Sequence, residues 1–132
     1  MSIVVGFIPT PEGMAAVAAA EEEAKRRKVK LIVVHSSKGG RSEDGAEVLE
    51  VRDDLRELGE RLAEHGVEVV TRDVAVGQDP VDDLVGIAEE ERADLIVIGL
   101  RRRSPVGKLI MGSNSQKILL EADCPVLAVK AD

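Results

Sequence analysis

One stretch of the sequence decides the fold: ADLIVIG, residues 93–99. Its run of apolar residues, rich in β-branched side chains and closed by a glycine, predicts a strand buried on both faces. A similar run, VLAV, occupies residues 126–129. The residues between the two runs hold a glycine-containing loop and then a short helical pattern. A strand, a crossover and a second strand are therefore expected in the last third of the chain.

The rest of the chain repeats this alternation. Strands are predicted over residues 2–8, 29–35, 67–74, 94–100 and 125–130, and helices over residues 11–27, 46–64, from 80 onward, and 114–122. Alternating strands and helices indicate an α/β fold, a doubly wound parallel sheet with helices on both faces. The pattern contains no internal repeat and no linker, so residues 1–132 are expected to form a single domain.

Composition limits the classes of partner. The 132 residues carry a net charge of −7, which disfavours a role on nucleic acid or on an anionic membrane. Phe7 is the sole aromatic residue, so stacking platforms for bases are not expected. Cys124 is the single cysteine, which fits a reducing compartment. No apolar run approaches the length of a membrane span, and a cytoplasmic location is expected.

A group of cations interrupts this acidic chain. Arg101, Arg102, Arg103 and Lys108 lie between residues 100 and 112, where no acidic residue occurs. Such runs are often only a solvated surface. Four cations in a loop that leads into a helix instead favour an anionic ligand.

The helix after this loop offers a second anion-binding feature. Gly112, Ser113 and Asn114 stand at its start, where free backbone N–H groups and the helix dipole favour a phosphate. Ser113 and Gln116 also have the spacing of a capping box, and taken alone this spacing favours a structural cap. Gly99 either lets a ligand approach the end of the strand or simply allows a tight exit from it.

Several catalytic and metal-binding motifs are excluded. Gly107 and Lys108 match the Gly-Lys pair of a phosphate-binding P-loop. The pattern fails at two other positions, because Arg102 stands where it requires Gly and Leu109 where it requires Ser or Thr. His35, His65 and Cys124 do not have the spacing of a metal site. No residue is placed as a general base, so neither catalytic residues nor a resident metal is expected, and the chain is not predicted to be an enzyme.

These residues carry a resemblance to the universal stress protein family. Residues 93–99, 112–115 and 124–129 are similar to its C-terminal signature. Nucleotide-binding members have Gly, two residues, Gly, nine residues, Gly and then Ser or Thr. Gly99, Gly112 and Ser113 match this pattern, whereas Arg102 replaces the second Gly. Ile8 stands where members often have an Asp that contacts the nucleoside.

The resemblance implies a fold and a ligand. The fold is a five-stranded parallel sheet in the order 3-2-1-4-5, of the adenine nucleotide alpha hydrolase-like type. The ligand is ATP or AMP, with or without Mg²⁺, between the ends of strands one and four. The expected nucleotide-binding residues are Phe7, Ile8, Pro9, Thr10, Val34, His35, Gly99, Arg101, Arg102, Arg103, Lys108, Gly112, Ser113 and Asn114.

The resemblance also implies a homodimer paired through the last strand, Val126 to Val129. This agrees with the sequence, because that strand would otherwise be an exposed apolar edge. The expected function is that of a universal stress-type protein that binds an adenine nucleotide in a regulatory role. The alternative is a dimeric scaffold or regulatory module of the same fold, in which Arg102 and Ile8 have closed the pocket.

Overall fold

The structure is a computed structural model that describes residues 1–36, 45–74, 79–102, 109–110 and 112–131. Side chains of residues 45–51, 101–102 and 109–110 lie outside this description. The elements, in chain order, are β1 (Ser2–Gly6), α1 (Pro11–Arg27), β2 (Lys30–Ser36), α2 (Gly45–Glu64), β3 (Val69–Val74), α3 (Pro80–Glu90), β4 (Ala93–Arg102), β5 (Leu109–Ile110), α4 (Ser113–Glu121) and β6 (Val126–Lys130).

Five of the strands form a parallel sheet in the order β3-β2-β1-β4-β6. This confirms the predicted order 3-2-1-4-5, in which the fifth strand is β6. The short strand β5 was not predicted. It pairs antiparallel with the end of β4, Arg101 opposite Ile110 and Arg102 opposite Leu109. A pairing of two residues leaves no periodic signal in a sequence, so it escapes pattern analysis.

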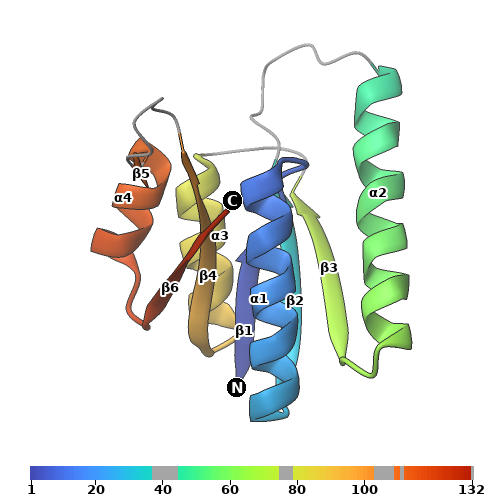
Figure 1. The fold of residues 1–132 in the computed structure, drawn as a ribbon, viewed down its shortest axis with the longest axis horizontal. Helices are drawn as coiled ribbons and strands as arrows, with labels where there is room; N and C mark the ends of the chain where they lie inside the picture. Colours follow the sequence, from blue (N-terminus) through green and yellow to red (C-terminus); the bar gives the residue numbers. More distant parts are fainter. Residues whose placement is uncertain (37–44, 75–78, 103–108, 111, 132) are drawn as a thin grey trace.

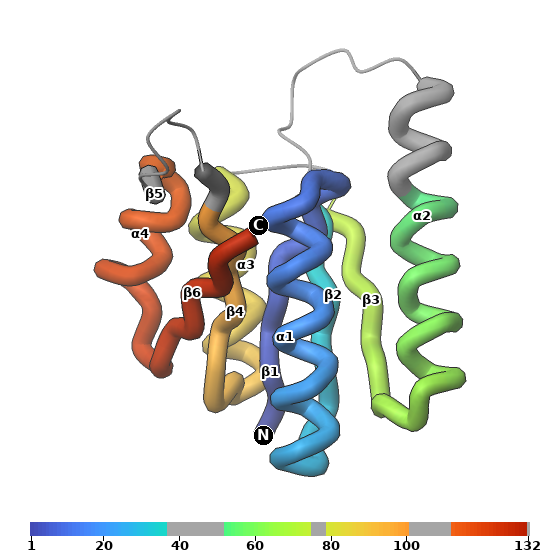
Figure 2. Tube along the Cα trace, in the orientation of Figure 1, coloured from blue at the N-terminus to red at the C-terminus, as the bar shows by residue number. Residues whose placement is uncertain are grey.

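The sheet separates two apolar layers (Figure 1). On one face, α1 and α2 pack on Ile3, Val5 and Val33 of the central strands. On the other face, α3 and α4 pack on Val4 and Ile96. Alternate residues of each strand thus enter opposite layers, which is why the central strands are apolar throughout. The trace in Figure 2 shows α2 beside β3 at one edge, and α4 with β6 at the other.

Two helix starts match their predictions. Thr10 caps α1, because its hydroxyl oxygen accepts a hydrogen bond from the backbone N–H of Gly13 at 3.1 Å. Asp79 caps α3, because its carboxylate accepts one from the backbone N–H of Val81 at 2.9 Å. In both helices the proline after the cap stands where a missing N–H removes no helical hydrogen bond.

The capping-box interpretation of Ser113 is wrong. The N-cap residue of α4 is Gly112, whose carbonyl accepts the first helical hydrogen bond, from the N–H of Gln116 at 3.1 Å. Ser113 is therefore the first helical residue, one position too far along the chain to act as the cap. This helix start has no side-chain capping hydrogen bond. The spacing Ser-x-x-Gln was misleading because glycine is also a favourable N-cap residue.

The first strand ends earlier than predicted. It stops at Gly6, and the backbone N–H of Phe7 then donates to the carbonyl of Val34 on β2 at 2.7 Å. Phe7 is buried, whereas Ile8 is 55% exposed. Residues 7–10 thus form a turn above the sheet, which places Ile8 beyond the strand and not within it.

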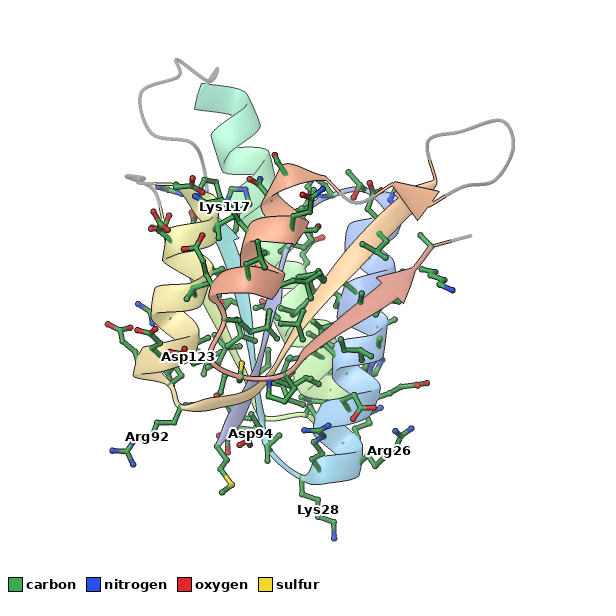
Figure 3. All side chains as sticks on the ribbon, turned by 90° about the vertical axis from the view of Figure 1, so that its left-hand side faces the viewer. Arg26, Lys28, Arg92, Asp94, Lys117 and Asp123 are labelled. Carbon is green, nitrogen blue, oxygen red and sulfur yellow. The ribbon has the colours of Figure 1, made fainter. Side chains whose placement is uncertain are left out.

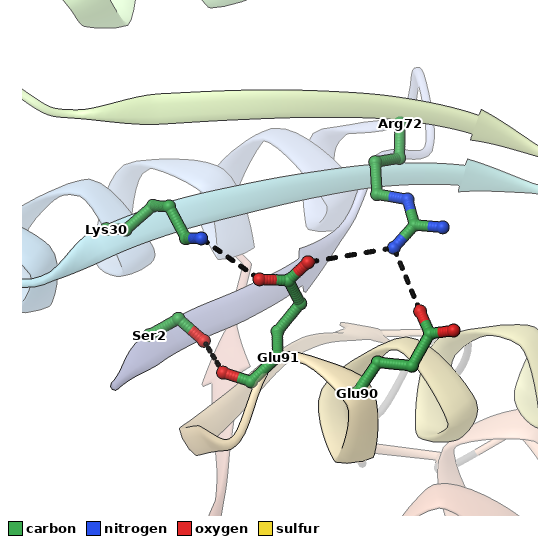
Figure 4. Close-up of polar contacts among 5 residues, drawn as sticks. All are labelled: Ser2, Lys30, Arg72, Glu90 and Glu91. Atoms are coloured by element: carbon green, nitrogen blue, oxygen red, sulfur yellow. Dashed lines mark hydrogen bonds and ion pairs between the residues drawn. The ribbon is translucent and has the colours of Figure 1, made fainter.

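A polar cluster lies at the end of the sheet where the parallel strands begin (Figure 4). The buried hydroxyl of Ser2 donates to the backbone carbonyl of Glu91 at 3.0 Å. The carboxylate of Glu91 pairs with Lys30 at 3.0 Å and with Arg72 at 3.9 Å. The hydrogen bond from Lys30 holds the pKa of Glu91 below its usual range. The cluster ties β1, β2 and β3 to the end of α3.

Within the described part of the chain, no helix is both long and apolar enough to cross a membrane.

Candidate functional site

A pocket lies at the edge where the parallel strands end, the upper edge in Figure 1. It encloses about 280 Å³. Its walls come from the ends of β1, β2 and β4 and from the first turns of three helices. The lining residues are Gly6, Phe7, Ile8, Glu12, Gly13, Val34, Ser36, Pro80, Val81, Leu84, Val97, Ile98, Gly99, Asn114, Ser115 and Ile118.

The pocket occupies the point where the winding of the sheet reverses. Strand β1 pairs with β2 on one side and with β4 on the other. The crossovers leave in opposite directions from this pair, so the helices diverge and leave a hollow between the strand ends. Open α/β sheets bind their ligands at such a point.

Part of the hollow exists because Gly6 has no side chain. A Cβ atom added to Gly6 would meet no other atom within 4 Å. Gly6 follows Val4 on the same face of β1, and Val4 packs in the layer with α3 and α4. The space in front of Gly6 is therefore a real opening into the pocket that a larger residue would fill.

Two other glycines position the start of α1 over the strand ends. A Cβ atom on Gly99 would stand 2.7 Å from the carbonyl carbon of Glu12. A Cβ atom on Gly13 would stand 2.9 Å from the carbonyl carbon of Ile8. The first turn of α1 thus rests directly on the end of β4 and on the β1–α1 turn. The structure therefore explains the glycine at position 99 by the close packing of α1 against it.

The three helix starts at the pocket differ in charge. The first turn of α1 holds Glu12, and that of α3 holds Asp82 and Asp83. The first turn of α4 holds no acidic residue and has no side-chain cap. Negative side chains near a helix start neutralise its dipole and occupy its free N–H groups. Of these three helices, α4 has the start best suited to an anionic ligand.

An ion pair joins α3 and α4, the two helices that flank the pocket on one face of the sheet. The ammonium of Lys117 lies 3.1 Å from the carboxylate of Asp79, the cap of α3. The hydrogen bond to Asp79 raises the pKa of Lys117 above its ordinary value. Figure 3 shows Lys117 at the upper end of α4, on the side of α3. The pair links the starts of both helices beside the pocket residues Pro80 and Asn114.

Few polar side chains belong to the lining. Ser36 donates a hydrogen bond of 2.6 Å to the carboxylate of Asp83, which ties the end of β2 to α3. Asn114 and Ser115 come from the first turn of α4. Much of the remaining wall is aliphatic, including Val34 and Leu84. Such a site suits a flat apolar group with a few polar anchors at one end.

The predicted site residues divide into four groups, of which the first three are as follows. Phe7, Ile8, Val34, Gly99 and Asn114 line the pocket. Gly112 and Ser113 lie at the start of α4, beside the pocket, and both residues are exposed. The side chains of Arg101 and Arg102, and the whole of Arg103 and Lys108, lie outside the described residues.

Pro9, Thr10 and His35 lie elsewhere. Pro9 and Thr10 line a second hollow of about 510 Å³ on the face covered by α1 and α2. His35 lies on that same face, where its Nδ1 atom is 3.1 Å from the carboxylate of Asp73. The His35 ring also meets Phe7 edge to face, with ring centroids 6.4 Å apart.

Sequence patterns did not reveal the contribution of α3 and the first turn of α1. Pro80, Val81 and Leu84 were expected only as part of a helix that begins at residue 80. Glu12 and Gly13 were expected only as part of a helix. A usable signal did exist, because a capped helix start that follows a strand end points to the carboxyl edge of the sheet.

The described residues include neither a group arranged as a metal site nor a thiol with an environment that favours its reactive form. Among them, no group of three or more His, Cys, Asp or Glu residues is arranged to hold a metal ion. Cys124 lies at the other edge of the sheet, beside Arg92 and Asp123 in another pocket. Burial raises the pKa of its thiol, which disfavours the reactive thiolate form.

Comparison with known proteins gives the family. The sequence model of the universal stress protein family matches residues 1–130. The chain belongs to the universal stress protein family. A universal stress protein of Mycolicibacterium smegmatis is 42% identical over 130 residues, which cover 97% of this chain and 96% of the relative.

Solved structures of universal stress proteins have the same fold. One from Archaeoglobus fulgidus has a TM-score of 0.85 and 36% identity, with 98% of each chain covered. Another from that organism, solved in complex with dAMP, has a TM-score of 0.79 and 30% identity, again over 98% of each chain. A universal stress protein in complex with cAMP has a TM-score of 0.74 and 26% identity, over 100% of this chain and 98% of the other.

Proposed function

We propose that this universal stress protein binds an adenine nucleotide, ATP or AMP, in the pocket at the ends of β1, β2 and β4. The observation that carries the proposal is the position of the pocket. It lies where the winding reverses, and the start of α4, which has no side-chain capping hydrogen bond, forms one wall. Two similar proteins were solved with dAMP and with cAMP, which supports the choice of an adenine nucleotide.

The lining fits the parts of such a ligand. The aliphatic wall formed by Val34, Val81 and Leu84 suits a base, and the start of α4 suits a phosphate. The pocket of about 280 Å³ is near the small end of the roughly 300–1,000 Å³ typical of ligand pockets. It suits the base and sugar of one nucleotide, with the phosphates extending over Gly112 and Ser113. The segment 101–108 contains four cations, and we expect their charge to balance that of the phosphates. They are Arg101, Arg102, Arg103 and Lys108.

The role that follows is regulatory and not catalytic. Binding of a nucleotide would report its concentration by stabilising the folded, ligand-bound state. We expect no hydrolysis, a cytoplasmic location, and a homodimer in which the edge strand β6 pairs with its copy. Strand β6 suits such pairing, since in the described sheet its one neighbour is β4 and Leu127 is 36% exposed.

The direct test is calorimetric titration of protein stripped of small molecules, with AMP and with ATP, in the presence and absence of magnesium. The pocket-filling variant is Gly6→Leu, because the side chain would enter the open space without meeting other protein atoms at its Cβ. The matched control is Gly86→Leu on α3, where an added Cβ also meets nothing within 4 Å and the residue does not line the pocket.

The wild type and Gly86→Leu are expected to bind AMP or ATP alike, whereas Gly6→Leu should lose at least about tenfold in affinity, that is about 1.4 kcal/mol. Equal binding by all three proteins would place the nucleotide elsewhere. Absence of binding by the wild type would favour the alternative of a dimeric scaffold or regulatory module without nucleotide. A steady release of inorganic phosphate from ATP, lost in Gly6→Leu, would overturn the expectation that the protein is not an enzyme.

A further inference from the structure

Glu12 is the one acidic residue among the described residues that line the pocket. It is the second residue of α1, after Pro11, and it is partly exposed. Its Cβ atom lies 3.2 Å from the position where a Cβ atom on Gly99 would stand. The side chain of Glu12 therefore begins directly above the end of β4. Side chains of a helix lean toward its N-terminus, which for α1 is the edge where the pocket lies.

The lining residues follow one another in a definite order along this edge. At one end, β2 and α3 contribute the aliphatic residues Val34 and Leu84. In the middle, β1 and β4 contribute Gly6 and Gly99, with Glu12 above them. At the other end stands the first turn of α4. The pocket thus changes from an apolar end, through a middle with a carboxylate, to an anion-binding end.

A nucleotide has a matching order of base, sugar and phosphate. Burial of apolar area favours the base at the aliphatic end, and the helix dipole favours the phosphate at the start of α4. The covalent structure then leaves the sugar in the middle, beside Gly99 and Glu12. A phosphate is disfavoured at this central position, because the carboxylate would repel it. Sugar hydroxyls are hydrogen-bond donors, and an ionised carboxylate is purely an acceptor.

Building on the proposed nucleotide binding, we infer that Glu12 determines sugar specificity by accepting a hydrogen bond from a ribose hydroxyl. Acidic residues serve this purpose in dinucleotide-binding folds, where they contact the 2′-hydroxyl. The protein therefore distinguishes ribonucleotides from deoxyribonucleotides through α1 and not through the end of β1.

The test compares three ligands that differ by one hydroxyl: AMP, 2′-deoxy-AMP and 3′-deoxy-AMP. Their dissociation constants are measured by calorimetry on the wild type, Glu12→Gln, Glu12→Ala and the control Glu22→Gln. Glu22 lies on the exposed side of the same helix and does not line the pocket. The ratio of two dissociation constants on one protein cancels any loss of correctly folded material.

The wild type and Glu22→Gln should bind AMP about tenfold or more tightly than at least one deoxy analogue, as expected for a charge-assisted hydrogen bond. That ratio should fall below about two in Glu12→Ala and take an intermediate value in Glu12→Gln, whose amide oxygen is a weaker acceptor. The analogue that loses affinity identifies the hydroxyl.

Two results would overturn the inference while nucleotide binding stands. One is equal affinity of the wild type for all three ligands, and the other is an unchanged ratio in Glu12→Ala. Failure of the wild type to bind any of these three ligands, together with failure to bind ATP in the titration above, would overturn both this inference and the proposed function.

Discussion

The backbone of Glu12 closes over Gly99, with the Glu12 carbonyl carbon 2.7 Å from the position of a Cβ atom on Gly99. The contact joins the first turn of α1 to the end of β4, two segments far apart in sequence. Because the opposing atoms belong to backbone, no side-chain rotation can relieve the overlap that a larger residue would create. This packing fixes the central wall of the pocket.

Gly99→Ala is therefore expected to destabilise the protein. Forcing one methyl group into a closely packed site typically costs about 1–3 kcal/mol. The measurement is the free energy of unfolding in urea. The control Gly86→Ala places the same methyl group in open space within α3 and should stabilise the protein by roughly 0.5–1 kcal/mol. Equal stability of Gly99→Ala and the wild type would contradict this close packing of α1 on β4.

The order of the sheet was predictable because each of its strands leaves a strong local signal. Buried parallel strands such as residues 95–98 are continuously apolar, and the helices between them start at Thr10-Pro11 and Asp79-Pro80. Strand β3 is less continuously apolar than the central strands, as suits an edge strand, and three of its six residues are exposed. These signals are local, so a single sequence carries them.

The composition of the pocket was predictable only in part, because it depends on packing between distant segments. Gly99 on β4 was singled out, but Glu12, whose backbone packs against it, belongs to α1, far away in the sequence. Ser113 was expected to contact a nucleotide, but its spacing to Gln116 also favoured a cap, because the shift of one residue toward Gly112 leaves no trace in the sequence. Pro80 and Leu84 enter the site through the crossover geometry, of which the sequence shows only the capped helix start at Asp79 and Pro80.

Ser113→Ala tests the proposed phosphate end of the site. The Ser113 hydroxyl makes no capping hydrogen bond at the start of α4, so its removal should leave the helix start intact. Loss of one hydrogen bond to a phosphate should weaken AMP binding by roughly three- to tenfold, by analogy with a net value of about 1 kcal/mol for such a bond. Binding of adenosine, which lacks the phosphate, should not change.

Arg103→Glu combined with Ser113→Ala should remove detectable AMP binding, because it also reverses a charge in the cationic segment. Calorimetry with both ligands checks these expectations. A loss that is equal for adenosine and AMP would mean that Ser113 acts on the pocket as a whole and not on the phosphate.

The contact of His65 with Glu21 predicts a pH dependence of stability. Nδ1 of His65, just after the end of α2, lies 2.7 Å from the carboxylate of Glu21 on α1, and Lys25 lies 3.2 Å from the same oxygen. Burial raises the pKa of Glu21, but hydrogen bonds from His65 and Lys25 outweigh it and leave the pKa below its ordinary value. The carboxylate of Glu21 therefore binds its proton more weakly in the folded state than in the unfolded state.

The stabilisation from Glu21 is complete above its ordinary pKa of about 4.5 and is lost as the pH falls through the lower pKa of the folded state. In His65→Ala this loss should be smaller, so the stabilities of the variant and the wild type should converge below pH 4.5. Urea unfolding between pH 7 and pH 3 measures the two curves. The control Glu22→Gln should follow the wild type, and a constant difference between His65→Ala and the wild type would show that the contact is not coupled to this proton.

The proposed pairing of β6 with its copy predicts which of the two sheet edges controls assembly. Leu127 on β6 is 36% exposed, and Val70 on β3, at the opposite edge, is 38% exposed. A lysine at position 127 would place a charge at the apolar edge and, in a symmetric dimer, two like charges near each other. Leu127→Lys should therefore be monomeric at concentrations where the wild type is dimeric, whereas Val70→Lys should remain dimeric. Light scattering coupled to size exclusion measures both masses. A monomeric wild type would exclude the dimer, and a selective effect of Val70→Lys would assign assembly to β3.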